Sequence, residues 1–242
     1  MKRWYALAAA VLLLTAAGFG GSALYARGLV RFNYPSRSRY PIWGLDVSHH
    51  QGTIDWPAVR RTGEVTFVYI KATEGGDWVD PRFSMNWTRA RAAGFTVGAY
   101  HFFTFCRSAE EQAANFIRVV PVESDALPPV LDLEFGGNCR RRPSTDEVRR
   151  EIGDWQERVT ARFGRRPLLY VTYEFVEAYL QDMSPPGEVW IRDIFTSPRL
   201  PRWRLWQFAN RGRIAGIRGP VDLNVFQGDH AAWQALLQGG GT

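Results

Sequence analysis

Apolar and polar positions follow an alternating strand and helix order from about residue 42 onward. Local signals mark where helices begin and end. Asp80-Pro81 begins one helical segment, which ends at Gly94, and Ser108 with Glu111 forms a possible capping box before the helical run AANFIRVV. The strand-like runs between the helical segments lie at 42–47, 65–72, 96–103, 129–135 and 167–173. Strands that alternate with helices predict a parallel sheet with right-handed crossovers.

The pattern changes after a short helical segment at about 174–181. Three more strand-like runs, 188–193, 203–209 and 221–226, follow with short links, and a final helix closes the chain. This gives eight strands, of which only the first five are followed by helices. We therefore predict a single α/β domain over 42–242, a (β/α)5β3 barrel that modifies the TIM-like plan.

A charge-free segment precedes this domain. Between Arg3 and Arg27 lie 23 residues without a charge, which is about the length that crosses a bilayer and long for the core of a signal peptide. We expect residues 1–26 to be a signal peptide or a signal anchor, with 4–26 in the inner membrane in the latter case. Four arginines follow the segment and two basic residues precede it, which opposes an exported domain by the positive-inside rule. The chemistry below outweighs that rule.

The net charge of +6 comes from residues 1–41, which contain six basic residues and no acid. The rest of the chain is neutral and shows no basic stripe, so we expect no nucleic-acid partner. Residues 27–41 are expected to form a polar linker.

Polar residues collect at the ends of the predicted strands, where barrels of this kind place their active sites. Several such residues on one rim favour a functional site over isolated caps or ion pairs. They are Asp46, Lys71, Glu74, Tyr100, His101, Asp132, Glu134, Tyr170, Tyr173, Asp193, Trp206, Gln207, Asp222 and Asn224.

The run LPPVLDLEFGGN (127–138) is the most specific part of this rim. On a strand, Leu131, Leu133 and Phe135 face one way, and Asp132 and Glu134 face the other. Crowded carboxyls repel one another, so one keeps a proton while others ionise. Glycoside hydrolysis needs that division between a proton donor and a stabilising carboxylate, and Trp and Tyr rings offer flat surfaces to sugars.

Other chemistries are weaker. Carboxylates with His101 could hold a divalent ion, but His49 and His50 are adjacent and would face opposite ways on a strand. No G-x-S-x-G elbow and no phosphate-binding glycine loop is present. We expect neither a metal nor another cofactor.

The two cysteines, Cys106 and Cys139, follow the third and fourth strands. They could be free core thiols, but neighbouring strands would place both above the same rim, which favours a disulfide formed in an oxidising compartment. Such a bond would close a loop of about 30 residues and contribute about 3–4 kcal/mol.

Taken together, these motifs resemble family 25 glycoside hydrolases, lysozymes that cut bacterial cell-wall peptidoglycan. The similarity runs from about Ile42 to Asp229 and keeps the order and spacing of the family. Its stretches are GLDVSHHQGTIDW, FVYIKATEG, GFTVGAYHFF, PVLDLEF, LLYVTY, LWQFA and VDLNVF.

The resemblance implies a (β/α)5β3 barrel that cleaves the β-1,4 bond between N-acetylmuramic acid and N-acetylglucosamine. It implies that Glu134 is the general acid, that Asp132 assists as nucleophile or by orienting the substrate's acetamido group, and that Asp46 and Asp222 complete the acidic cluster. Tyr100 and Trp206 would line the sugar site, and Tyr170, Gln207, Asn224, Lys71 and Glu74 are further candidates for substrate binding.

The N-terminal tail and the cysteine pair depart from the family, and IRDIF (191–195) also carries charges where a blander strand end is expected. We predict an exported, monomeric muramidase that acts on glycan strands in the periplasm or at the cell surface and is tethered through its N-terminal segment. The alternatives are a barrel that binds glycan without cutting it and another amino-sugar hydrolase of the chitinase type.

Overall fold

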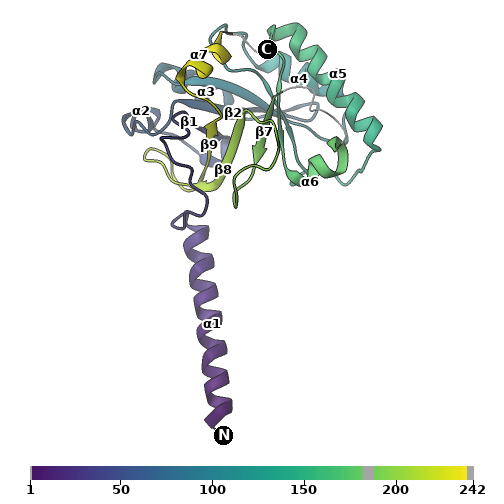
Figure 1. Cartoon of the computed structure of the whole chain (residues 1–242). Coiled ribbons are helices and arrows are strands. Elements are labelled where there is room, and N and C mark those ends of the chain that lie inside the picture. Colours follow the sequence, from purple (N-terminus) through teal and green to yellow (C-terminus); the bar gives the residue numbers. More distant parts are fainter. Residues whose placement is uncertain (1, 182–187, 239–242) are drawn as a thin grey trace.

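The structure, a computed structural model, describes residues 2–181 and 188–238 (Figure 1). Within these residues, eight strands form a closed barrel. Residues 1, 182–187 and 239–242 belong to the predicted domains but lie outside the described residues. Neighbouring barrel strands form seven hydrogen-bonded pairs. An eighth pair, between the first two barrel strands, closes the sheet. The barrel strands are β1 (Trp43–Val47), β2 (Phe67–Glu74), β4 (Thr96–Phe102), β5 (Val130–Leu133), β6 (Leu168–Val171), β7 (Val189–Arg192), β8 (Leu205–Gly212) and β9 (Val221–Phe226).

Two details differ from the predicted sheet. A two-residue strand, β3 (Trp78–Val79), extends β2 as a short antiparallel ribbon that the sequence pattern did not indicate. The barrel is also not wholly parallel, because β9 runs antiparallel to both of its neighbours, β8 and β1. The short link between β8 and β9 explains the second difference, since only a hairpin can be joined without a long crossover.

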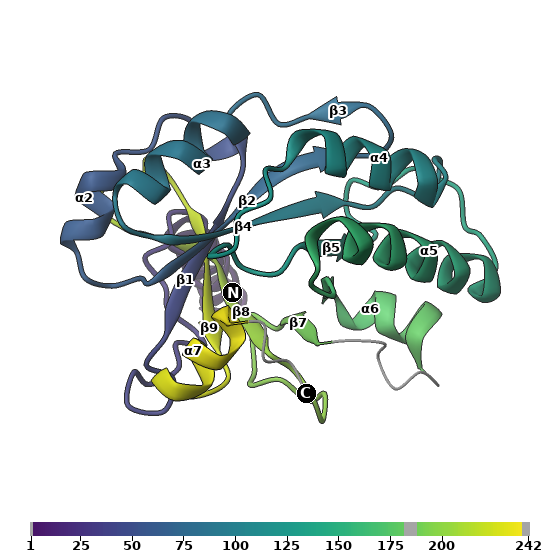
Figure 2. The same cartoon turned by 90° about the horizontal axis from the view of Figure 1, so that it is seen from above.

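Helices cover part of the barrel (Figure 2). Most begin at side-chain caps that the sequence shows, such as Ser108 before α4 and Ser144 before α5. The elements are η1 (His49–Gln51), α2 (Trp56–Arg61), α3 (Phe83–Ala92), α4 (Ala109–Val119), α5 (Thr145–Phe163), α6 (Tyr173–Phe175), its π-helical continuation η2 (Val176–Leu180), and α7 (His230–Leu237).

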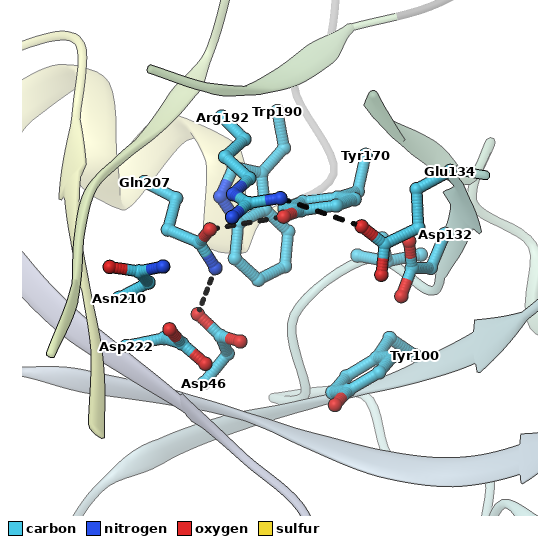
Figure 3. Close-up of a pocket in the computed structure, with 11 residues that line it drawn as sticks. Asp46, Tyr100, Asp132, Glu134, Tyr170, Trp190, Arg192, Gln207, Asn210 and Asp222 are labelled. Carbon is cyan, nitrogen blue, oxygen red and sulfur yellow. Dashed lines mark hydrogen bonds and ion pairs between the residues drawn. The ribbon is translucent and has the colours of Figure 1, made fainter. Parts of the chain in front are cut away.

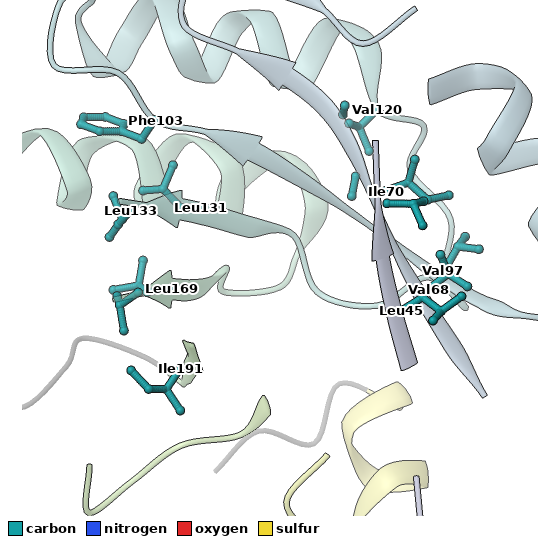
Figure 4. Packing of buried hydrophobic residues seen from close by; sticks show 14 of the residues in the cluster. Leu45, Val68, Ile70, Val97, Phe103, Val120, Leu131, Leu133, Leu169 and Ile191 are labelled. Atoms are coloured by element: carbon teal, nitrogen blue, oxygen red, sulfur yellow. The ribbon is translucent and has the colours of Figure 1, made fainter. Parts of the chain in front are cut away.

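Strand alternation separates two apolar clusters. Leu131 and Leu133 of β5 pack outward with the helices, in the larger cluster seen in Figure 4, together with Phe135 just beyond the strand. Val130 instead faces the barrel interior, where it joins a second cluster with Tyr69. Trp233 of α7 extends the inner cluster, which fills the barrel at the end opposite to its mouth. The polar residues nearer the carboxyl ends of the parallel strands surround a cavity at the mouth.

The N-terminal segment forms α1 (Lys2–Ala26), which projects from the barrel (Figure 1). Among the residues that the structure describes, no helix combines the length and apolar character needed to span a bilayer. The expectation of a membrane anchor therefore gains no support from α1.

Residues 27–41 do not behave as a free linker. Tyr40 is buried against Trp203 and Trp206, and Tyr34 packs on Trp43 and Phe208. This segment covers the outer face of β8. The described chain has no helix between β7 and β9, so the segment packs on the sheet where a helix packs elsewhere in the barrel. We call residues 33–40 the strap.

Candidate active site

A cavity of about 300 Å³ opens at the carboxyl ends of the parallel strands (Figure 3). Most of its lining comes from inward-facing positions of the barrel strands. The lining residues are Asp46, Tyr100, Val130, Asp132, Glu134, Tyr170, Trp190, Arg192, Gln207, Asn210 and Asp222.

Asp132 and Glu134 lie on one wall of the cavity, as their alternation on the strand predicts. Burial raises the pKa of both carboxyls, and the charge of Glu134 raises that of Asp132 further. Asp132 is 8% exposed, and its buried Oδ1 atom has no hydrogen-bond partner among the described residues. The side chain of Glu134 is 24% exposed, so it is the member of the pair that is open to a ligand.

Asp46 and Asp222 lie on the opposite wall, at paired positions of β1 and β9. Burial raises the pKa of both carboxyls, and the charge of Asp46 raises that of Asp222 further. Asp46 Oδ2 also accepts hydrogen bonds from Asn224 Nδ2 at 2.7 Å and Gln207 Nε2 at 3.1 Å, which lower its pKa in part. Such a pair shares a proton with Asp46 as the more readily ionised member.

Aromatic side chains form the floor of the cavity. Tyr170 donates from its hydroxyl to Gln207 Oε1 at 3.0 Å, and its ring meets Trp190 edge to face with centroids 5.1 Å apart. Burial raises the pKa of the Tyr100 and Tyr170 hydroxyls well above its usual value, so both stay neutral donors. The arrangement offers neutral hydrogen-bond donors and flat rings between two acidic walls.

The sequence and the fold of this chain match known proteins. A family model described as glycosyl hydrolases family 25 matches residues 45–217. The chain belongs to glycosyl hydrolase family 25.

Individual relatives agree with the family match. The uncharacterized protein YegX of Escherichia coli (strain K12) is 36% identical over 209 residues, which cover 83% of this chain and 75% of that protein. Lysozyme M1 of Streptomyces globisporus is 35% identical over 210 residues, covering 81% and 71%. The solved structure of a family 25 glycosyl hydrolase from Bacillus anthracis superposes with a TM-score of 0.78 at 39% identity, covering 85% of this chain and 97% of that one.

Within this family 25 barrel, Trp206 needs correction as a sugar-site residue. It is 1% exposed, its indole N–H donates to the Asp193 carbonyl at 2.7 Å, and it packs under the strap residue Tyr40. Because the neighbouring residue Gln207 faces the cavity, strand alternation turns Trp206 outward. The indole that does line the cavity is Trp190.

Three other predicted residues lie beside the cavity and not in its lining. Asn224 is fully buried and connects Asp46 with the indole N–H of Trp190, which donates to its Oδ1 at 2.9 Å. Lys71 and Glu74 form an ion pair of 2.7 Å at the mouth, with the Lys71 ammonium beside the rings of Trp78 and Phe102. The charge of Lys71 lowers the pKa of Asp132 and Glu134 from there.

The histidines are outside the cavity. His101 faces the helical layer, stacks on Trp155, and contacts Thr73 and Gln112 through its ring nitrogens. Burial lowers its pKa to about 3, so it is a neutral core residue. His49 pairs with Asp80 at 2.9 Å. No group of three His, Cys, Asp or Glu residues within the described ranges is placed to hold a metal ion.

The disulfide prediction is confirmed. Cys106 and Cys139 are bonded, which ties the segment after β4 to the segment after β5 beside the mouth. Asn138 reinforces this tie, since its side chain contacts the Phe105 N–H at 3.0 Å and the carbonyls of Phe103 and Glu134 at 2.8 and 3.0 Å. Glu134 is therefore held by a cross-linked rim.

Sequence reasoning missed four lining residues: Val130, Trp190, Arg192 and Asn210. Alternation from the outward-facing Ile191 would have placed Trp190 and Arg192 inside. Asn210 had no such signal, because the β8 register shifts between Gln207 and Ala209 and again before Gly212. Its Oδ1 accepts from the hydroxyl of Tyr25 at 3.2 Å, so the end of α1 touches the cavity wall.

Proposed function

We propose that this chain is a muramidase that hydrolyses the β-1,4 bond between N-acetylmuramic acid and N-acetylglucosamine in peptidoglycan. The observation that carries the proposal is the pair Asp132 and Glu134 in a cavity whose facing wall holds Asp46 and Asp222. Membership of family 25 and the likeness to lysozyme M1 support it.

In this proposal Glu134 is the general acid. Its raised pKa keeps a proton at mildly acidic pH, and its exposure lets it reach the leaving oxygen. Asp46, the more readily ionised member of its pair, stabilises the cationic transition state across the cavity. Tyr100, Tyr170, Gln207 and Trp190 bind the sugar, and Asn224 positions Asp46 and Trp190 from beneath.

Replacement of the acid tests the assignment. Glu134→Gln keeps the size of the side chain and removes its proton, and we expect the release of muramic-acid reducing ends from purified peptidoglycan to fall by about 10²–10⁴-fold. Glu64→Gln is the matched control, because it makes the same change at an exposed residue outside the cavity. A Glu134→Gln protein with full activity would refute the assignment, and a wild type that binds glycan without cutting it would favour the binding module.

Asp132 assists in one of two ways that leave different traces. If it attacks the anomeric carbon, a glycosyl-enzyme adduct forms on Asp132 and mass spectrometry of a slow-substrate reaction detects it. If it orients the acetamido group for attack, N-deacetylated glycan is not cleaved and no adduct forms. We favour the second role, because the raised pKa of the buried Asp132 carboxyl favours its protonated form, and a protonated carboxyl does not attack the anomeric carbon.

We further propose that the protein acts as a single chain outside the cytoplasm, where peptidoglycan lies and where the disulfide can form. The mass of the mature protein in cell fractions tests the fate of residues 1–26: loss of this segment identifies it as a signal peptide. A cytoplasmic full-length protein with reduced cysteines would contradict export.

A further inference from the structure

Arg192 gives the acidic cavity a cation. It ends β7 at an inward-facing position and is the one Lys or Arg among the lining residues in the described chain. Figure 3 shows its side chain between Gln207 and Glu134, with the ion pair to Glu134 marked. In the proposed cleavage this guanidinium lowers the pKa of Glu134, but the neutral glycosidic bond itself offers it no charged partner.

The guanidinium is poorly paired within the protein. Its nearest carboxylate oxygen, Glu134 Oε2, is 3.8 Å from Nη1, which is too long for a hydrogen bond. Among the described residues no other ion pair or hydrogen bond involves its side chain, although a guanidinium has five N–H donors. The side chain is 35% exposed, and it contributes to the cavity lining.

Other partly buried arginines in this chain are engaged. Arg204, at the opposite end of the barrel, forms an ion pair with Glu188. Arg165 donates to the Ala126 carbonyl at 2.7 Å, and Arg149 donates to the Tyr179 carbonyl at 2.8 Å. Partial burial of a charged group without hydrogen bonds is costly, so the open donors of Arg192 point to an acceptor that the substrate brings.

The ligand that best satisfies a guanidinium is a carboxylate, which accepts two parallel hydrogen bonds. The acidic walls do not forbid such an anion, because burial raises the pKa of all four carboxyls and the cluster retains protons. In peptidoglycan, muramic acid carries a lactyl ether whose carboxyl is amide-linked to the stem peptide. That carboxyl becomes a free anion when the peptide has been removed.

We propose that Arg192 binds the free lactyl carboxylate of muramic acid, and that the enzyme thereby prefers glycan strands stripped of their stem peptides. This rests on the proposed muramidase function and adds its substrate class. Arg192 is then a specificity-determining residue. The class of reaction that must supply such a substrate is hydrolysis of the amide between the lactyl group and the first amino acid.

Two matched substrates test the preference. Tetrasaccharides of alternating N-acetylglucosamine and N-acetylmuramic acid are prepared with the lactyl carboxyl either free or converted to its methylamide, which removes the charge and little else. The wild-type kcat/KM on the free acid should exceed that on the methylamide by about 10- to 100-fold, mostly through KM. The same tetrasaccharide with intact stem peptides should resemble the methylamide.

Variants locate the effect. Arg192→Gln should lose the 10- to 100-fold preference by raising KM on the free acid, with a smaller effect on the methylamide, and Arg192→Lys should keep part of it. Arg204→Gln, which removes an arginine of similar burial outside the cavity, should keep the full preference. Equal loss on both substrates in Arg192→Gln would overturn the proposal.

The wild type can also overturn it without any variant. Equal rates on the two tetrasaccharides, or faster cleavage of the one that carries stem peptides, would show that no free carboxylate is recognised. If neither tetrasaccharide nor purified cell wall is cut, the muramidase function itself fails, and that result differs from cleavage without preference.

Discussion

At the scale of single residues, the proposed role of Glu134 as general acid makes the charges around it set the pH range of the enzyme. The carboxyl faces Arg192 on β7, Lys71 on β2, Asp46 on β1, Glu174 on α6 and its strand neighbour Asp132. Burial raises its pKa, and the two cations lower it in part. A proton donor with these neighbours works below the pH at which it ionises, so activity must fall as pH rises through its pKa.

Arg192→Gln should therefore move the alkaline limb of the kcat/KM profile to higher pH, because the variant no longer lowers the pKa of Glu134. The shift is measured on the methylamide substrate, where the carboxylate-binding role of Arg192 is absent. Arg204→Gln is the control and should leave the limb in place. If the alkaline limb stays at the same pH in Arg192→Gln, a group other than Glu134 causes it.

The buried acids should also cost stability. A carboxyl whose pKa is higher in the folded than in the unfolded state holds more protons when folded, so stability falls as pH rises from about 4 towards the folded pKa. For Asp222 both burial and the charge of Asp46 raise the pKa. Asp222→Asn should raise the melting temperature at pH 7 and change it little at pH 4. Stabilisation of the same size at both pH values would contradict this account.

Individual residues show what a sequence pattern can and cannot locate. Alternation along β5 placed Asp132 and Glu134 in the cavity, because a four-residue strand without a bulge keeps its period of two. The same rule, applied to β8, would have turned Trp206 outward from the inward Gln207. Asn210 lies beyond an irregularity in the β8 register, and no period-two pattern extends through it.

At the scale of elements, the disulfide joins two loops that carry no regular structure of their own. It links residues 33 apart in the sequence. Replacing both cysteines by serine should lower the free energy of unfolding by about 2–4 kcal/mol, as denaturant unfolding measures, because the unfolded chain regains the freedom of that loop. Catalysis should weaken as well, since Asn138 beside Cys139 holds the Glu134 carbonyl. An unchanged unfolding midpoint would show that the bond stabilises nothing.

The order of strands and helices could be predicted from the sequence because caps and apolar runs mark each element locally, as at Ser108 and Ser144. The direction of β9 could not. Asp222 lies near the start of its strand and still reaches the catalytic end, because an antiparallel strand begins where its neighbours finish. The rule that active sites lie at the carboxyl ends of barrel strands applies to parallel strands. It selected Asp222 correctly, although β9 is antiparallel and Asp222 lies near the amino end of that strand.

At the scale of the whole molecule, the strap makes the barrel depend on residues that precede it. Asn33 donates to the carbonyls of Asp193 at 3.2 Å and Thr196 at 2.6 Å, and Tyr34 and Tyr40 cover the outer face of β8. The sequence alone suggested a linker here, because its frequent arginines and serines resemble those of solvated segments. The aromatic residues among them were the signal for packing.

A protein that begins at residue 42 should therefore unfold at lower denaturant than one that begins at residue 27. Loss of the two tyrosines exposes apolar surface worth about 3–5 kcal/mol. Both truncated proteins lack α1, so the comparison isolates residues 27–41, which contain the strap. Equal unfolding midpoints would mean that the strap contributes no stability.

The place where α1 joins the barrel has a further consequence. The hydroxyl of Tyr25 holds the cavity residue Asn210, and the Arg211 side chain donates to the Ala26 carbonyl at 3.1 Å, so the helix is rooted at the lip of the catalytic mouth. A 25-residue helix is a rod of about 37 Å. In the proposed muramidase, a glycan strand bound across the mouth lies beside this rod for as long as residues 1–26 stay attached. Removal of that segment as a signal peptide would open this side of the mouth.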